Sequence, residues 1–184
     1  MMRFLITILF LSFFSCKSPK EEVSDYLLDT TSKIVVMSYP ERISWDKRKT
    51  KNIIENNKIL FDTTMVIDKV QLEKEDVKTF INILNKEFIS PNGVDQISSC
   101  YLPRHLAVFY DEKNNIIAYL ESCFNCGTTN NSENLEIFYG FDLEKLKEFY
   151  KKKNIKYFVD SEEDEDKELK YIDSIKSTNN KILK

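Results

Sequence analysis

The stretch from Cys100 to Cys126 constrains the fold more than any other part of the chain, because it contains the clearest hairpin pattern. Residues 106–110 and 116–120 are apolar and rich in strand-forming side chains. The five residues between them read Asp-Glu-Lys-Asn-Asn, and Asn and Asp tolerate the positive φ angles that tight turns need. The pattern predicts two antiparallel strands joined by a local turn. Neither run alternates strictly with polar residues, so we expect both faces of this ribbon to be covered.

The position of the turn decides which side chains meet across the hairpin. A turn centred on Lys113 places Cys100 opposite Cys126, whereas a two-residue turn at 114–115 places Pro103 opposite Cys126. Proline cannot donate to a strand ladder, so regular pairing should begin after Pro103. In both registers the three cysteines of this stretch and the single histidine of the chain gather at the open end of the hairpin: Cys100, His105, Cys123 and Cys126.

Several chemical roles are open to this group. A disulfide from Cys100 to Cys123 or Cys126 needs Cα atoms about 4.4–6.8 Å apart, which neighbouring strands supply. A zinc site would use three thiolates and His105 as the fourth ligand. A redox or nucleophilic thiol is less favoured, because the Gly-Thr-Thr-Asn-Asn-Ser that follows Cys126 is typical of a loop and not of a helix start. Ordinary buried thiols are the remaining interpretation. If a disulfide forms, one of the three cysteines stays free.

Two neighbouring residues have simpler interpretations. His105 taken alone is more often a structural histidine than a ligand. Arg104 is expected to form an ion pair or to bond carbonyl groups beside Pro103.

The central segment also resembles a signature of bacterial proteins for which no activity is established, Cys-Tyr-x-Pro-Arg, then a hairpin, then Cys-Phe-x-Cys. The resemblance is limited to this segment and implies no reaction. The residues that carry it are Cys100, Tyr101, Pro103, Arg104, Cys123, Phe124 and Cys126.

The N-terminus has the pattern of a secretion signal. Arg3 supplies a short basic region, and residues 4–14 are nearly all apolar but too few for a bilayer, which needs about 20. Phe13-Phe14-Ser15-Cys16 resembles the lipobox of bacterial lipoproteins, with Phe13 in place of the usual Leu. That resemblance implies that residues 1–15 are removed and that Cys16 is acylated with diacylglycerol and an amide-linked chain such as palmitate. The lipid bilayer would then be a partner, and residues 16–24 would be a polar tether.

Composition sets further limits on the function. A chain of 184 residues with 42% hydrophobic residues suffices for one domain, expected over residues 25–160. The net charge of −3 does not suggest nucleic-acid binding, and three glycines leave no glycine-rich phosphate loop. A single histidine without a nucleophile–base pair argues against hydrolase chemistry.

The rest of the chain predicts an α+β fold, with an antiparallel sheet of about four to six strands packed against two amphipathic helices. The helices are expected over residues 74–88 and 141–153, where apolar residues recur at helical spacing. Further strands are expected over residues 33–39, 58–61, 65–72 and 135–139, and possible short ones over 155–159. Residues 127–134 should form a loop, and the charged tail, residues 161–184, should be helical or disordered.

These patterns suggest a membrane-anchored, extracytoplasmic lipoprotein with a binding or structural role, located at the outer membrane or the cell surface. Its partner beyond the bilayer would be a protein or a small molecule. The alternative is a zinc- or thiol-dependent enzyme centred on the cysteines, in which zinc would be the cofactor.

Overall fold

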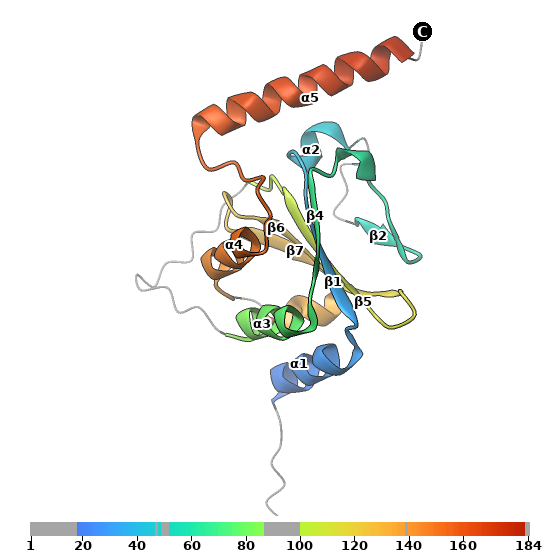
Figure 1. The fold of residues 1–184 in the computed structure, drawn as a ribbon, viewed down its shortest axis with the longest axis vertical. Coiled ribbons are helices and arrows are strands. Elements are labelled where there is room, and N and C mark those ends of the chain that lie inside the picture. Colours follow the sequence, from blue (N-terminus) through green and yellow to red (C-terminus); the bar gives the residue numbers. More distant parts are fainter. Residues whose placement is uncertain (1–17, 47, 49–51, 87–99, 139, 183–184) are drawn as a thin grey trace, which may run out of the picture.

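The computed structural model describes residues 18–46, 48, 52–86, 100–138 and 140–182. The expected signal peptide and the lipidated Cys16 lie outside these residues. The fold is α+β, as predicted, and is built on a five-stranded antiparallel sheet (Figure 1). Its strands, in spatial order, are β4 (Asp68–Leu72), β1 (Lys33–Ser38), β5 (His105–Tyr110), β6 (Ile116–Cys123) and β7 (Thr128–Asn131).

The other described elements are a second small sheet, helices and 3-10 turns. A small two-stranded sheet consists of β2 (Ile54–Glu55) and β3 (Lys58–Ile59). The helices are α1 (Pro19–Thr30), α2 (Arg42–Trp45), α3 (Lys74–Asn85), α4 (Leu143–Lys152) and α5 (Glu162–Ile182), and the 3-10 turns are η1 (Thr63–Met65) and η2 (Glu133–Phe138).

The central hairpin has its turn where one of the two predicted registers places it. Tyr110 pairs with Ile116, which centres the turn on Lys113, and Asn114 adopts a φ of 63° within it. A bulge beside Tyr110 shifts the pairing by one residue, so that His105 lies opposite Ser122 at the other end. Regular pairing therefore starts after Pro103, as predicted.

One face of the sheet carries the larger core. Helices α1, α3 and α4 lie on this side (Figure 1), together with η2. Phe80 of α3 is at its centre, with its ring 5.5 Å from that of Phe109 and 6.0 Å from that of Tyr150. The apolar stripe of α3 explains this position, because Val77, Phe80, Ile81 and Leu84 are all buried. The helix ends at Asn85, and residues 87 and 88 of the predicted helix lie outside the described residues.

The opposite face carries a smaller core. Tyr39 follows β1 and packs against Phe61 and Trp45, with ring centroids 5.0 and 6.3 Å away. The small sheet and α2 border this cluster, which also contains Val35, Met37, Ile53, Leu106 and Val108. Because the two faces of β5 both meet a core, the strand lacks polar alternation, as its sequence suggested.

The start of the domain differs from the prediction. Residues 19–24 were expected to be part of a tether, but Pro19–Thr30 is helix α1. The Ser18 side chain accepts from the Glu21 N–H while the Glu21 carboxylate accepts from the Ser18 N–H, which is a capping box. Leu27 is fully buried, so this helix belongs to the folded domain.

Two segments after the hairpin adopt structures that differ from the prediction. Residues 127–134 were expected to be a loop, yet Thr128–Asn131 forms strand β7 against β6. Residues 135–139 were expected to be a strand, yet Leu135 and Phe138 lie in the 3-10 turn η2. The spacing of these two buried residues is three, which suits a helical turn and not a strand. Residues 155–159 form no strand in the part of the chain that is described.

The charged tail forms helix α5, which crosses one end of the molecule (Figure 1). Glu168 and Ile172 are buried at 5% and 1% exposure, so the tail is packed onto the domain and not merely solvated. No helix among the described residues is long and apolar enough to span a membrane.

Candidate functional site

The three cysteines of the central segment meet, as the hairpin pattern predicts. Cys100 and Cys126 form a disulfide with a Cα–Cα distance of 5.7 Å, and Cys123 is a free, buried thiol. The three Sγ atoms lie within 4.8 Å of one another. One of the two predicted pairings is therefore present, with one cysteine left over.

A tight turn after β6 brings Cys123 and Cys126 together. The backbone N–H of Cys126 donates to the Cys123 Sγ over 3.2 Å. Gly127 then adopts a φ of 65°, which glycine accepts without strain, and its N–H donates to the Phe124 carbonyl. This turn directs the chain into β7 and places Cys126 beside Cys100.

The environment of Cys123 does not favour a reactive thiolate. Burial raises the pKa of this thiol above its ordinary value, although the Cys126 N–H and the nearby Arg104 guanidinium both stabilise the thiolate. A thiol with a raised pKa is mostly protonated at neutral pH and is a weak nucleophile.

His105 lies away from the sulfur atoms. The group of possible metal ligands among the described residues contains the three cysteines and not His105. Its Nε2 lies 2.9 Å from the Tyr157 carbonyl, and because a carbonyl only accepts, Nε2 is the protonated nitrogen. The ring stacks on Phe158 and packs against Phe124. The zinc set predicted with His105 as fourth ligand therefore does not form; three thiolates are the ligands that this arrangement offers.

Burial lowers the pKa of His105 to about 3, despite the hydrogen bond to the Tyr157 carbonyl. The imidazole is therefore neutral at physiological pH. Its role is structural, which is the simpler interpretation of a single histidine.

A buried ion pair lies on the same face of β6 as Cys123. Arg42 of α2 donates to both carboxylate oxygens of Glu121, through Nε over 2.6 Å and through Nη2 over 3.1 Å. The hydroxyls of Tyr39 and Tyr101 donate to the same carboxylate. Neither side chain of the pair is exposed to solvent, and Arg42 also bonds Asp46. Arg42, Tyr39 and Tyr101 thus satisfy the buried Glu121 carboxylate with four hydrogen bonds. The sequence gives no signal for this network, because Arg42 and Glu121 are 79 residues apart.

A second buried ion pair joins the hairpin to the tail. The Arg104 guanidinium donates to both oxygens of Glu168, with its shortest contact at 2.6 Å. Glu168 also accepts from the Glu41 N–H and the Tyr157 hydroxyl. The ion-pair role predicted for Arg104 is confirmed, and hydrogen bonding to Glu168 raises the pKa of its guanidinium against the effect of burial.

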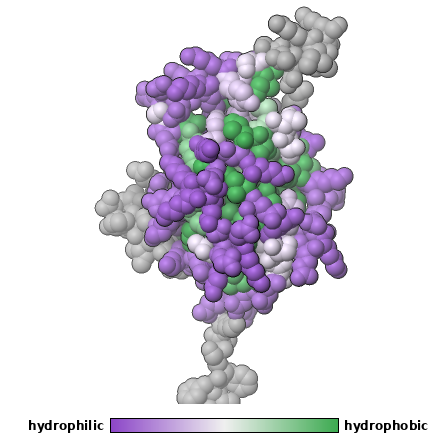
Figure 2. Space-filling model, in the orientation of Figure 1, coloured by the Kyte–Doolittle hydropathy of each residue, from purple (hydrophilic) through white to green (hydrophobic). Residues whose placement is uncertain are grey.

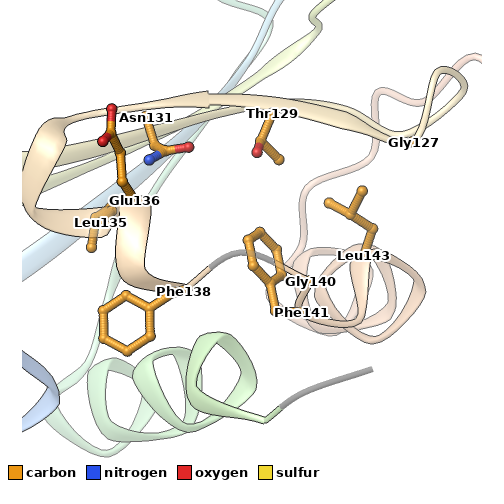
Figure 3. Close-up of a pocket in the computed structure, with 9 residues that line it drawn as sticks. All are labelled: Gly127, Thr129, Asn131, Leu135, Glu136, Phe138, Gly140, Phe141 and Leu143. Carbon is orange, nitrogen blue, oxygen red and sulfur yellow. The ribbon is translucent and has the colours of Figure 1, made fainter. Parts of the chain in front are cut away.

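A pocket of about 260 Å³ lies below β7, between this strand, η2 and the start of α4 (Figure 3). Thr129 and Phe141 point toward one another across it, and Asn131 lies next to Glu136 (Figure 3). Leu135, Phe138 and Leu143 complete its apolar lining, and Gly127 and Gly140 also line it. Gly127 directly follows Cys126, so the pocket and the three cysteines are neighbours along the chain.

A second, more open groove of about 420 Å³ lies between α5 and residues 156–159. The exposed side chains of Ile67 and Tyr171 border it. Figure 2 shows that the surface is mostly hydrophilic, with apolar residues gathered along the middle of the face in view.

Comparison of the chain with protein-family models, with curated proteins and with solved structures gave no match. The function therefore has to be inferred from the chemistry of these residues.

Proposed function

We propose that this protein is a lipid-anchored, extracytoplasmic binding protein, located at the outer membrane or the cell surface. The observation that carries the proposal is the Cys100–Cys126 disulfide inside the domain. Disulfides persist in oxidising compartments and are rare in the cytosol. This chemistry agrees with the signal-like residues 1–15 and with the lipobox-like sequence that ends at Cys16.

The anchor would be formed by the acyl chains on Cys16. Each buried CH₂ contributes about 0.8 kcal/mol, so two or more chains hold a protein firmly in a bilayer. Helix α1 begins at Pro19, and only a short connection therefore separates the acylated residue from the folded domain. The domain would be held close to the lipid surface.

A binding role is supported by the elements that hold the pocket in place. The disulfide and the buried Arg42–Glu121 pair fix the end of the hairpin from which β7 starts. Binding sites require elements held in place by packing and satisfied hydrogen bonds. The pocket combines apolar walls with a few polar groups, which is the usual composition of a ligand site.

The anchor is tested by metabolic labelling with a fatty-acid analogue in a bacterial host that acylates lipoproteins. We expect the full chain to be labelled and to partition with membranes, and Cys16→Ala to be unlabelled and released. The matched control is Cys123→Ala, which retains label because this thiol is buried within the fold. Undiminished labelling of Cys16→Ala would refute the proposed anchor.

A metal- or thiol-dependent centre is a second candidate function, because three Sγ atoms lie within 4.8 Å of one another. After reduction of the disulfide, Cys100, Cys123 and Cys126 would supply three thiolates, and zinc with three protein ligands keeps a position for water or substrate. The raised pKa of Cys123 weighs against a purely thiol-based reaction.

Thiol counting and metal analysis of protein isolated without reductant separate the two candidates. If the protein is the binding protein, denaturant alone should expose one alkylatable thiol among Cys100, Cys123 and Cys126, and reduction should expose all three. No stoichiometric metal should be present. One equivalent of zinc, with three thiols that become alkylatable on chelation, would favour the second candidate instead.

A further inference from the structure

Strand β7 is an outer strand of the sheet, and its hydrogen-bonding pattern shows which of its backbone groups face away from β6. The N–H of Ser132 donates to the Tyr119 carbonyl over 3.1 Å, so these residues form a hydrogen-bonded pair. Such pairs alternate along an antiparallel ladder. With the observed register, the backbone groups of Thr129 and Asn131 point outward from the sheet.

The neighbouring ladder agrees with this assignment. Thr129 lies opposite Ser122, and the Ser122 carbonyl accepts from the Arg104 N–H on the other side of β6. The Ser122 carbonyl therefore points away from β7. Among the described residues, no strand pairs with the outer edge of β7.

The same two residues also line the pocket. Side chains of paired residues lie on one face of a sheet, so Thr129 and Asn131 share the face of Ser122 and Leu120, where α4 packs. Figure 3 shows both side chains on the pocket side of β7. A strand added to this edge would thus run beside the opening of the pocket.

The lining of the pocket favours a cationic side chain with an apolar stem. Its polar side chains are Thr129, Asn131 and the exposed carboxylate of Glu136, all of which offer oxygen acceptors. No basic side chain lines it in the part of the chain that is described. The Phe141 ring adds a surface on which a cation is attracted. The remaining walls are apolar and suit the methylene groups of lysine or arginine.

We propose that β7 binds an extended peptide segment of a partner protein as an additional strand, and that the pocket takes a lysine or arginine side chain of that segment. Main-chain hydrogen bonds to Thr129 and Asn131 would supply the general affinity, and Glu136 would supply selectivity for the basic side chain. This inference rests on the proposed binding function and names the chemistry of the partner.

The test uses a fluorescein-labelled, terminally blocked peptide of sequence Thr-Val-Thr-Lys-Thr-Val-Thr and fluorescence anisotropy with the full chain. A second peptide replaces the lysine by norleucine, which keeps the stem and removes the charge. A third carries N-methyl groups on the lysine and on the residue after it, so that at least one inward-facing N–H is lost in either alignment.

We expect the lysine peptide to bind about tenfold more tightly than the norleucine peptide, as for a hydrogen bond to a charged group. The N-methylated peptide should not bind. Glu136→Gln should reduce the preference for lysine to less than twofold, while Glu133→Gln should leave it unchanged. Glu133 is the matched control, since it is exposed at the start of the same turn and does not line the pocket.

Three results would overturn the inference: no binding of the lysine peptide, equal binding of the N-methylated peptide, or a preference for lysine that survives Glu136→Gln. Displacement of the lysine peptide by butylamine at similar concentration would show a site for small amines and would likewise refute strand addition. Acyl labelling of Cys16 and thiol counting involve no peptide, so failure of this inference is distinguishable from failure of the proposed function.

Discussion

His105 and Cys123 lie at the same end of one hairpin, yet their side chains enter different parts of the molecule. His105 pairs with Ser122, so the next residue along β6 points to the other face of the sheet. The His105 ring packs against the rings of Phe124 and Phe158. The Cys123 thiol instead lies beside the Cys100–Cys126 disulfide. The sequence correctly places both residues at this end, but a shift of register by one residue changes which face a side chain occupies.

His105 should make the protein sensitive to mild acid. Its pKa is about 3 in the folded protein, against 6.5 for an unperturbed histidine. Between these values the unfolded chain binds a proton that the folded protein does not, so stability is complete above pH 6.5 and is lost as the pH falls. We expect a loss of about 2 kcal/mol between pH 7.5 and 5.

Urea unfolding of the wild type and of His105→Gln across this pH range tests the expectation. Whatever the absolute stability of the glutamine variant, its free energy of unfolding should be nearly independent of pH from 7.5 to 5. The chain has a single histidine, so no other imidazole contributes. Asp68, whose pKa is lowered chiefly by hydrogen bonds from Tyr157, Ser38 and Lys156, loses its contribution only at lower pH. Equal pH dependence of the two proteins would contradict a buried neutral histidine.

At the scale of elements, the hairpin and the two main helices are predictable because each is specified by local pattern. The apolar runs define β5 and β6, and the stripe of α3 defines its buried side. Strand β7 is not predictable in this way, since Thr128–Asn131 is polar throughout and becomes a strand only by pairing with β6. The short apolar run that follows was predicted as a strand because runs of this length do not separate strands from helical turns.

The disulfide belongs to this scale, because it joins the segment before β5 to the turn after β6. It closes a loop with a sequence separation of 26, for which chain entropy predicts a stabilisation of about 3–4 kcal/mol. The double variant Cys100→Ala/Cys126→Ala should therefore unfold at a clearly lower urea concentration. The double substitution avoids new pairing between Cys123 and a single remaining partner.

Reductant provides the internal control for this prediction. Dithiothreitol should lower the unfolding midpoint of the wild type and leave that of the double variant unchanged. Cys123→Ala removes one small buried side chain and should keep the response to reductant. A wild-type midpoint that does not respond to reductant would show that the disulfide does not stabilise the fold.

At the scale of the whole molecule, the charged tail packs against the domain and does not extend freely into solvent. Residues 162–166 of α5 are all acidic, which predicts a solvated segment, but Glu168 two residues later is buried against Arg104. The contact spans 64 residues along the chain, and the one to the Glu41 N–H spans 127. No local pattern distinguishes this glutamate from its neighbours, so its role emerges only when the sheet, α2 and α5 are assembled.

Glu168 should consequently matter far more than the other acidic residues of the tail. Removing its charge by Glu168→Gln leaves the Arg104 guanidinium buried without a carboxylate, and breaking a buried pair in this way costs about 3–5 kcal/mol. Glu163→Gln is the matched control, because the ion pair that Glu163 forms among the described residues is with exposed Lys167 on the same helix. Exposed ion pairs of this kind contribute little to the free energy of unfolding, because water and salt screen them. Urea unfolding of both variants should show a large loss for the first and almost none for the second. Equal stability of the two variants would mean that this ion pair does not hold α5 on the domain.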